Sequence, residues 1–170
     1  MIPVTLCALA LTAHAPLPPQ AADPPGRAVD AERLMATVRW LPASRAAAGD
    51  EQSRASLLAL QTDLAVKAVE LGYWPTAHPV RWKRRAEPTG LDWRNISFEI
   101  PGRTAPQEVL VVGAHFDAVP GSPGADDNGS GTAAVLEIAR VLRGRPMHRT
   151  VRFVLFNLEE LGHIGSNQYV

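Results

Sequence analysis

Two strand-like segments flanking an amphipathic segment constrain the fold more than any other feature of this sequence. Residues 109–114 form a continuous apolar run, residues 151–156 form a second strand-like segment, and residues 129–142 carry apolar side chains at helical spacing. Apolar runs of this length are typical of strands covered on both faces, so the pattern predicts a buried strand–helix–strand unit. The chain is therefore expected to adopt an α/β fold.

Further elements are predicted on the N-terminal side of this unit. The clearest is a helix over residues 53–71, where apolar residues recur every three or four positions before Gly72. A shorter helix is predicted over residues 30–40, a loop over 42–52, and strands over 80–84 and 95–100. Residues 165–170 have the pattern of the first turns of another helix. A chain of 170 residues is long enough for one domain with its own core.

The first 27 residues have a different composition from the rest of the chain. Residues 2–12 form an apolar run that is too short to span a bilayer, and Ala13-His14-Ala15 is a small-x-small cleavage pattern. We therefore expect a signal peptide over residues 1–15, a flexible proline-rich leader over 16–27, and a secreted or periplasmic protein without a membrane span. The absence of basic residues at the start leaves a disordered N-terminus as the alternative.

The charge balance of the chain bears on its partners. Lys and Arg together number 17, as do Asp and Glu, so the formal net charge is zero. Binding to nucleic acid or to an anionic membrane would call for a basic patch. The sequence gives no reason to expect either partner.

Ionisable residues follow the predicted strands at the points where those strands end. His115 and Asp117 follow the first strand, Asp126 and Asp127 precede the helix, and Glu159-Glu160 follows the second strand. Each motif alone has a structural explanation: a strand-end histidine, a helix N-cap, or a solvated acidic pair. Together they place one imidazole and several carboxylates at one sheet edge, where α/β folds bind ligands. His and carboxylate ligands without thiolate suit a hydrolytic zinc site.

This combination resembles the zinc exopeptidase family that holds the bacterial two-zinc aminopeptidases and glutamate carboxypeptidases. The resemblance covers about residues 94–170, and the predicted helix over 53–71 also fits it. It implies a three-layer α/β/α domain with a mixed, largely parallel sheet, incomplete in this chain. Residues 28–170 would then form the N-terminal part of the catalytic domain. The implied activity is release of N-terminal residues from a peptide substrate.

The resemblance also implies roles for individual residues. His115 would bind one zinc ion, Glu160 the other, and Asp127 would bridge the two. Asp117 would orient His115, and Glu159 would be the general base toward a water activated by two zinc ions. The peptide bond between Asp127 and Asn128 is expected to be cis.

Part of the expected site is absent from this sequence. The family pattern has two further ligands, an Asp and a His, which are expected beyond Val170, so these 170 residues alone are expected to be inactive. His163, where the family more often has an apolar residue, is predicted to be a surface histidine. The alternatives are a carboxypeptidase or glutaminyl cyclase of the same family, or a non-catalytic or truncated relative that acts as a binding domain.

Overall fold

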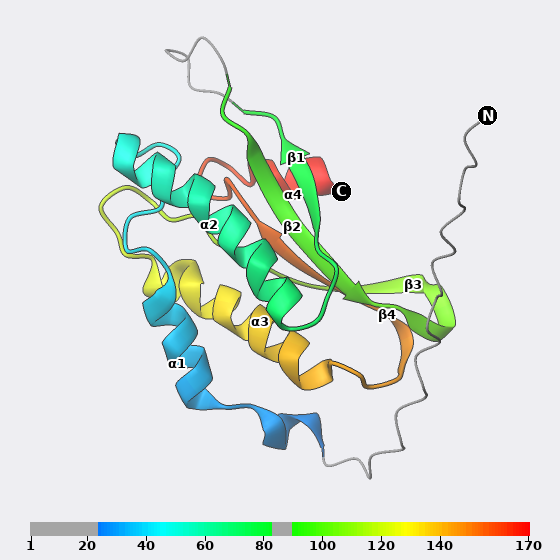
Figure 1. The fold of residues 1–170 in the computed structure, drawn as a ribbon. Coiled ribbons are helices and arrows are strands. Elements are labelled where there is room, and N and C mark those ends of the chain that lie inside the picture. The colour runs from blue at the N-terminus through cyan, green and yellow to red at the C-terminus, as the bar shows by residue number, and fades with distance from the viewer. Residues whose placement is uncertain (1–23, 83–89) are drawn as a thin grey trace, which may run out of the picture.

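The computed structural model describes residues 24–82 and 90–170. These residues form one mixed sheet with helices packed on it (Figure 1). The strands are β1 (Thr76–Val80), β2 (Trp93–Ile100), β3 (Gly102–His115) and β4 (Met147–Phe156). The helices are the 3₁₀ turn η1 (Pro25–Ala28), α1 (Ala31–Trp40), α2 (Glu51–Glu70), the wide turn η2 (Ala125–Ser130), α3 (Gly131–Leu142) and α4 (Ile164–Tyr169).

The strand order of the sheet is β1-β2-β4-β3. The pairs β1–β2 and β2–β4 are antiparallel, whereas β3 and β4 are parallel and are joined through α3. The predicted strand–helix–strand unit is therefore present, and the α/β class with a mixed sheet is confirmed. Of the strand pairs in the described residues, one is parallel and two are antiparallel.

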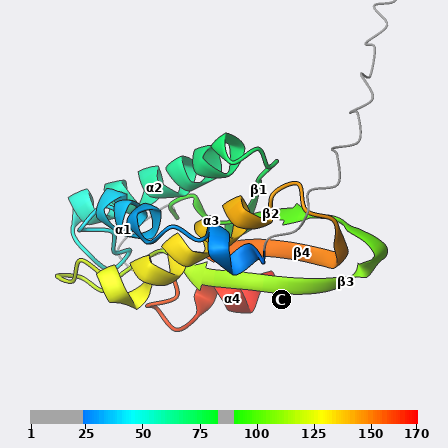
Figure 2. The same ribbon diagram turned by 90° about the horizontal axis from the view of Figure 1, so that it is seen from below.

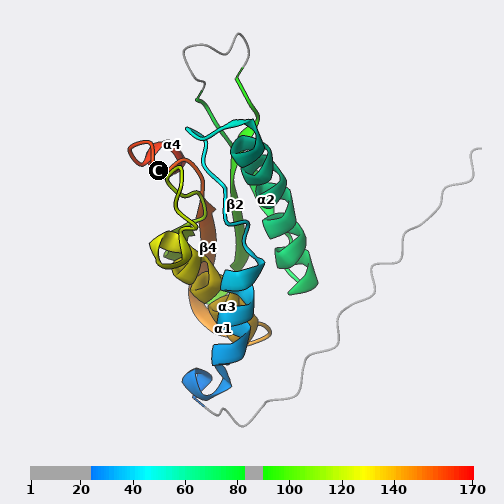
Figure 3. The same cartoon turned by 90° about the vertical axis from the view of Figure 1, so that its left-hand side faces the viewer.

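Helices lie on both faces of the sheet. Seen from below, α1, α2 and α3 lie on one side of the sheet and α4 lies on the other (Figure 2). On the first side, α3 packs on β3 and β4, α2 packs on β2, and α1 lies against α3 (Figure 3). On the other side, α4 contacts β1 and β2. The arrangement has the three layers expected of the fold.

The core lies between the sheet and the first helical layer. Leu57, Leu60 and Leu64 of α2 are fully buried, which confirms the apolar stripe predicted for this helix. Phe98 of β2 and Phe153 of β4 stack with ring centroids 5.3 Å apart. These apolar contacts fix the position of the central strand β4, which is followed by the acidic turn that contains Glu159 and Glu160.

Local sequence signals explain where the first two helices begin and end. The carboxylate of Asp30 accepts hydrogen bonds from the backbone N–H groups of Glu32 and Arg33 at the start of α1. Asp50 caps α2 in the same way. Gly72 follows α2 with a φ of +82°, a conformation that costs glycine little. Both helices match the predicted segments within a few residues.

The prediction that residues 109–114 are covered on both faces is wrong. Val109, Leu110 and Val111 are 42%, 57% and 50% exposed, because β3 is the edge strand of the described sheet and α3 covers only one of its faces. The apolar stripe predicted within residues 129–142 consisted of Ala134, Val135, Ile138 and Leu142, and it is partly wrong, since Ile138 is exposed while Leu136 and Ala139 are buried.

Some predictions fall wholly or partly outside the described residues. The signal peptide (1–15) and most of the leader (16–27) lie outside them, while the end of the leader enters η1. The strand predicted at 80–84 is found earlier, as β1, and residues 83 and 84 are not described. No helix within the described residues is long and apolar enough to cross a membrane.

Candidate metal centre

Three of the predicted site residues converge at the carboxyl ends of β3 and β4. His115 is the last residue of β3, Asp127 lies in η2, and Glu160 lies in the turn after β4. One side-chain ligand atom of each lies within 4.8 Å of those of the other two. His115 Nε2 lies 3.0 Å from Asp127 Oδ1. An imidazole and two carboxylates at these separations can share a cation.

Asp117 connects the two strand ends that carry the site. Its carboxylate is 1% exposed and accepts hydrogen bonds from the backbone N–H groups of Glu159 and Glu160, both at 3.1 Å. The same carboxylate lies 3.5 Å from His115 Nδ1, so the opposite ring nitrogen, Nε2, faces Asp127 and Glu159. Asp117 thus holds both the imidazole of His115 and the backbone of the acidic turn.

The start of α3 is fastened to the end of β3. Thr132 donates a hydrogen bond from Oγ1 to the carbonyl oxygen of His115 at 2.9 Å. Asn128 Oδ1 accepts from the backbone N–H of Gly131, and a Cβ at Gly131 would lie 2.1 Å from that oxygen. The peptide bond between Asp127 and Asn128 is cis, as the family resemblance implies. These contacts bring Asp127 back toward the end of β3.

Glu159 and His163 border the same group of side chains. Glu159 Oε2 lies 3.7 Å from His115 Nε2, and Oε1 lies 3.4 Å from Nε2 of His163. The side chain of Glu159 is 28% exposed, so water can reach it. His163 is 67% exposed, in agreement with its prediction as a surface residue. Asp126, the other acidic residue of η2, is exposed and does not belong to the cluster of His115, Asp127 and Glu160.

The side chains of this cluster carry an excess of negative charge. Burial disfavours the charged form of His115, but the neighbouring carboxylates of Asp117, Glu159 and Asp127 outweigh it and raise the pKa of His115 to about 9. Burial, followed by the charge of Asp127, raises the pKa of Glu160 above its ordinary value. The first shift has the direction expected of an imidazole beside carboxylates, and the second has the direction expected of a carboxyl group that is partly buried beside another carboxylate.

A buried amide network supports the acidic turn and was not predicted from the sequence. Asn95 Oδ1 accepts from the backbone N–H of Asn157, and Asn95 Nδ2 donates to the carbonyl of Gly165, both at 2.8 Å. Asn157 Nδ2 donates to Gln61 Oε1 of α2 at 3.3 Å. Asn157 stands in the Asn-x-Glu-Glu motif, but nothing in the sequence connects it with Asn95 or Gln61.

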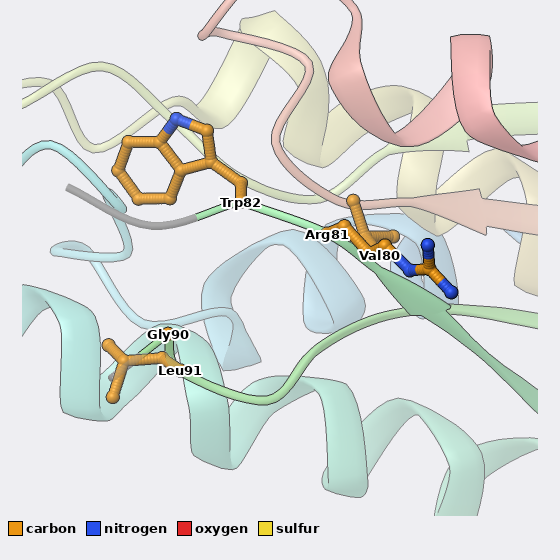
Figure 4. Close-up of a pocket in the computed structure, with 5 residues that line it drawn as sticks. All are labelled: Val80, Arg81, Trp82, Gly90 and Leu91. Carbon is orange, nitrogen blue, oxygen red and sulfur yellow. The ribbon is translucent and has the colours of Figure 1, made fainter. Parts of the chain in front are cut away.

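A separate cavity of about 550 Å³ lies where β1 ends (Figure 4). Its described lining consists of Val80, Arg81, Trp82, Gly90 and Leu91. None of these side chains is an imidazole or a carboxylate, so among the described residues this cavity offers no ligands for zinc.

The sequence profile of Peptidase family M28 matches residues 95–170, which contain every residue of the cluster described above. Residues 95–170 belong to this family. Aminopeptidase YwaD of Bacillus subtilis is 48% identical over 75 residues, which cover 44% of this chain and 16% of that protein. The probable lipoprotein aminopeptidase LpqL of Mycobacterium tuberculosis is 37% identical over 129 residues, which cover 71% of this chain and 25% of that protein.

Solved structures extend the likeness in fold to nearly the whole chain. The LapA aminopeptidase of Legionella pneumophila superimposes with a TM-score of 0.66 at 20% identity, over 98% of this chain and 44% of that one. At this identity the likeness concerns the fold alone. The chain spans no more than a quarter of the length of the two relatives named above.

Proposed function

We propose that this chain forms the N-terminal part of the catalytic domain of a zinc-dependent aminopeptidase, which hydrolyses the N-terminal peptide bond of a peptide. The observation that carries the proposal is the convergence of His115, Asp127 and Glu160 within 4.8 Å at one sheet edge. The two relatives named above are both described as aminopeptidases, which supports an aminopeptidase over the carboxypeptidase and glutaminyl cyclase alternatives.

The donor set fits zinc. One imidazole and two carboxylates without a thiolate are typical of hydrolytic zinc sites, and the buried carboxylate beside His115 Nδ1 is the usual support of a zinc-binding histidine. His115 would bind one ion, Glu160 a second, and Asp127 both, with the remaining ligands supplied by residues outside this chain. Zinc bound there would supply the Lewis acidity that polarises a scissile carbonyl and acidifies water.

The chain's own residues would perform the proton transfers. Glu159 is not one of the three proposed ligands, but its carboxylate lies beside His115 Nε2. Because the side chain of Glu159 is partly exposed, water can reach this residue. Its carboxylate would accept a proton from the attacking water and return it to the leaving amine. Asp117 accepts hydrogen bonds from the backbone N–H groups of Glu159 and Glu160. It would thereby keep the general base and His115 in fixed relative positions.

The acidic pair also bears on the alternative of a binding domain. A module that only binds peptides needs no general base, so the presence of Glu159 beside the ligand cluster favours an enzyme.

We also propose that the protein is secreted or periplasmic. The predicted signal peptide at residues 1–15 and a relative described as a lipoprotein aminopeptidase support this location.

Two substitutions in neighbouring residues test the proposal. In the whole protein that contains this chain, Glu159→Ala is expected to lower the hydrolysis of an aminoacyl p-nitroanilide by about 10²–10⁴-fold while zinc binding persists. Glu160→Ala is expected to weaken zinc binding itself, measured by competition with a chromogenic chelator. Asp126→Ala is the matched control, because it removes an exposed carboxylate next to the cluster.

The outcomes separate the two roles. Wild-type activity in the Glu159 variant would refute its assignment as the base. Unchanged zinc affinity in the Glu160 variant would refute the metal site. The 170 residues alone are expected to show no turnover, and strong chelator-sensitive hydrolysis by them would mean that the site lies elsewhere.

A further inference from the structure

Arg45, in the segment between α1 and α2, is a fully buried cation close to the proposed metal site. Its side chain is 1% exposed and donates hydrogen bonds only to backbone carbonyls among the described residues. A buried guanidinium is costly unless its donors are satisfied. Nε and both terminal nitrogens of Arg45 have carbonyl partners at 2.5–2.9 Å.

Three of these four carbonyls lie at the two ends of the loop formed by residues 116–124, and the fourth is that of Pro42. Arg45 Nε donates to the carbonyl of Phe116, which stands between His115 and Asp117, at 2.8 Å. The terminal nitrogens donate to Pro123 at 2.5 Å and to Gly124 at 2.7 Å. The carbonyl of Arg45 itself accepts from the N–H of Ala118 at 3.1 Å. One residue thus joins the start of the loop to its end.

The far end of the loop leads directly to Asp127. The carbonyl of Gly124 that binds Arg45 also accepts from the N–H of Gly129 at 2.9 Å, which closes the turn around Asp127. A Cβ at Gly124 would lie 2.8 Å from Arg45 Nη2 and 2.8 Å from the carbonyl oxygen of Asp127. The side chain of Arg45 is therefore packed against the backbone that carries this proposed ligand.

We propose that Arg45 is a positioning residue of the metal site, which holds the His115 and Asp127 ends of the 116–124 loop at the separation needed for both side chains to bind one ion. The inference rests on the proposed function. Arginine suits the task, because its planar fork reaches several carbonyls in fixed directions, which the single ammonium of lysine cannot do.

The direction in which zinc affinity changes when Arg45 is replaced distinguishes a positioning role from a purely electrostatic one. Asp117 and Glu160 are near enough to act on the charge of Arg45. By Coulomb's law alone, removing a positive charge from the neighbourhood of a cation site should tighten zinc binding. Loss of a positioning contact should weaken it, typically by about 10–100-fold for residues that support metal ligands.

The experiment uses the whole protein that contains this chain. It measures zinc affinity by chelator competition, and the visible spectrum of bound cobalt(II) as a readout of ligand geometry. We expect Arg45→Met and Arg45→Lys each to weaken zinc binding at least about tenfold and to alter the cobalt spectrum.

Leu57→Ala provides the control for general destabilisation, because Leu57 is fully buried in α2 and has no part in the site. It should lower the melting temperature while zinc affinity stays close to that of wild type. Unchanged or tighter zinc binding in Arg45→Met, or an equal loss in Leu57→Ala, would overturn the inference. If Glu160→Ala left the zinc affinity of the whole protein unchanged, the proposed function itself would fail, which is a distinguishable result.

Discussion

Replacing Asp117 by Asn should destabilise the protein even without metal. Each carboxylate oxygen of Asp117 accepts one backbone N–H, from Glu159 and from Glu160, at 3.1 Å. Asparagine has one acceptor oxygen, so its amide NH₂ would face the second N–H. A hydrogen bond to a charged group contributes about 1.5–3 kcal/mol, and a buried donor left without a partner costs about 1–3 kcal/mol. Since these contributions overlap, we expect the free energy of unfolding to fall by about 2–4 kcal/mol.

Urea unfolding of the metal-free chain, followed by far-UV circular dichroism, measures this loss. Asp126→Asn is the matched control, because it removes the same charge from an exposed carboxylate nine positions from Asp117 and should change stability by less than about 0.5 kcal/mol. If both variants unfolded at the wild-type urea concentration, Asp117 would not connect the two strand ends as described. Zinc affinity of the Asp117 variant should also fall, by about 10–100-fold.

Three further outcomes are expected. Burial raises the pKa of Tyr73 to about 12 from an ordinary value of 10.0. Tyr73 therefore ionises more readily in the unfolded state, and the free energy of unfolding falls as the pH rises from 10 to 12. Tyr73→Phe should therefore lose less stability than wild type over that range, although at neutral pH it lacks the hydrogen bond to Ala139 and should be about 1 kcal/mol less stable. Leu110→Lys should reduce concentration-dependent aggregation in light scattering without loss of secondary structure, because Leu110 is exposed on the edge strand. Asn95→Ala should lower the free energy of unfolding by about 2–4 kcal/mol in chemical denaturation, since it removes the side-chain partners of two buried backbone groups. A value below about 1 kcal/mol would contradict the supporting role of the amide network.

The residues at the strand ends could be predicted because their placement follows from chain order. Once residues 109–114 and 151–156 are identified as neighbouring parallel strands, His115 and Glu160 must meet at one edge, and the helix between them returns Asp127 to that edge. The N-caps of α1 and α2 are local signals and were equally readable.

Other features depend on contacts between distant segments and left no local signal. An apolar run is the same whether its strand is central or at an edge, so the exposure of Leu110 could not be read from the sequence. Arg45 lies in a loop that resembles an ordinary solvated connection, yet three of its four carbonyl partners are more than 70 positions away. Asn95 and Asn157 are 62 positions apart, and their pairing requires the antiparallel register of β2 and β4.

The strand order also has a consequence for how the chain reaches its native state. β2 and β3 follow one another across Pro101, yet β4 lies between them in the sheet. During synthesis both strands are complete more than 30 residues before β4 ends, so a hairpin of β2 with β3 is the nearest available pairing for the nascent chain. β4 can occupy its place only if those two strands are apart. Folding should therefore be slow compared with sheets whose neighbours are consecutive, and the ligand cluster should form only after the last strand has inserted.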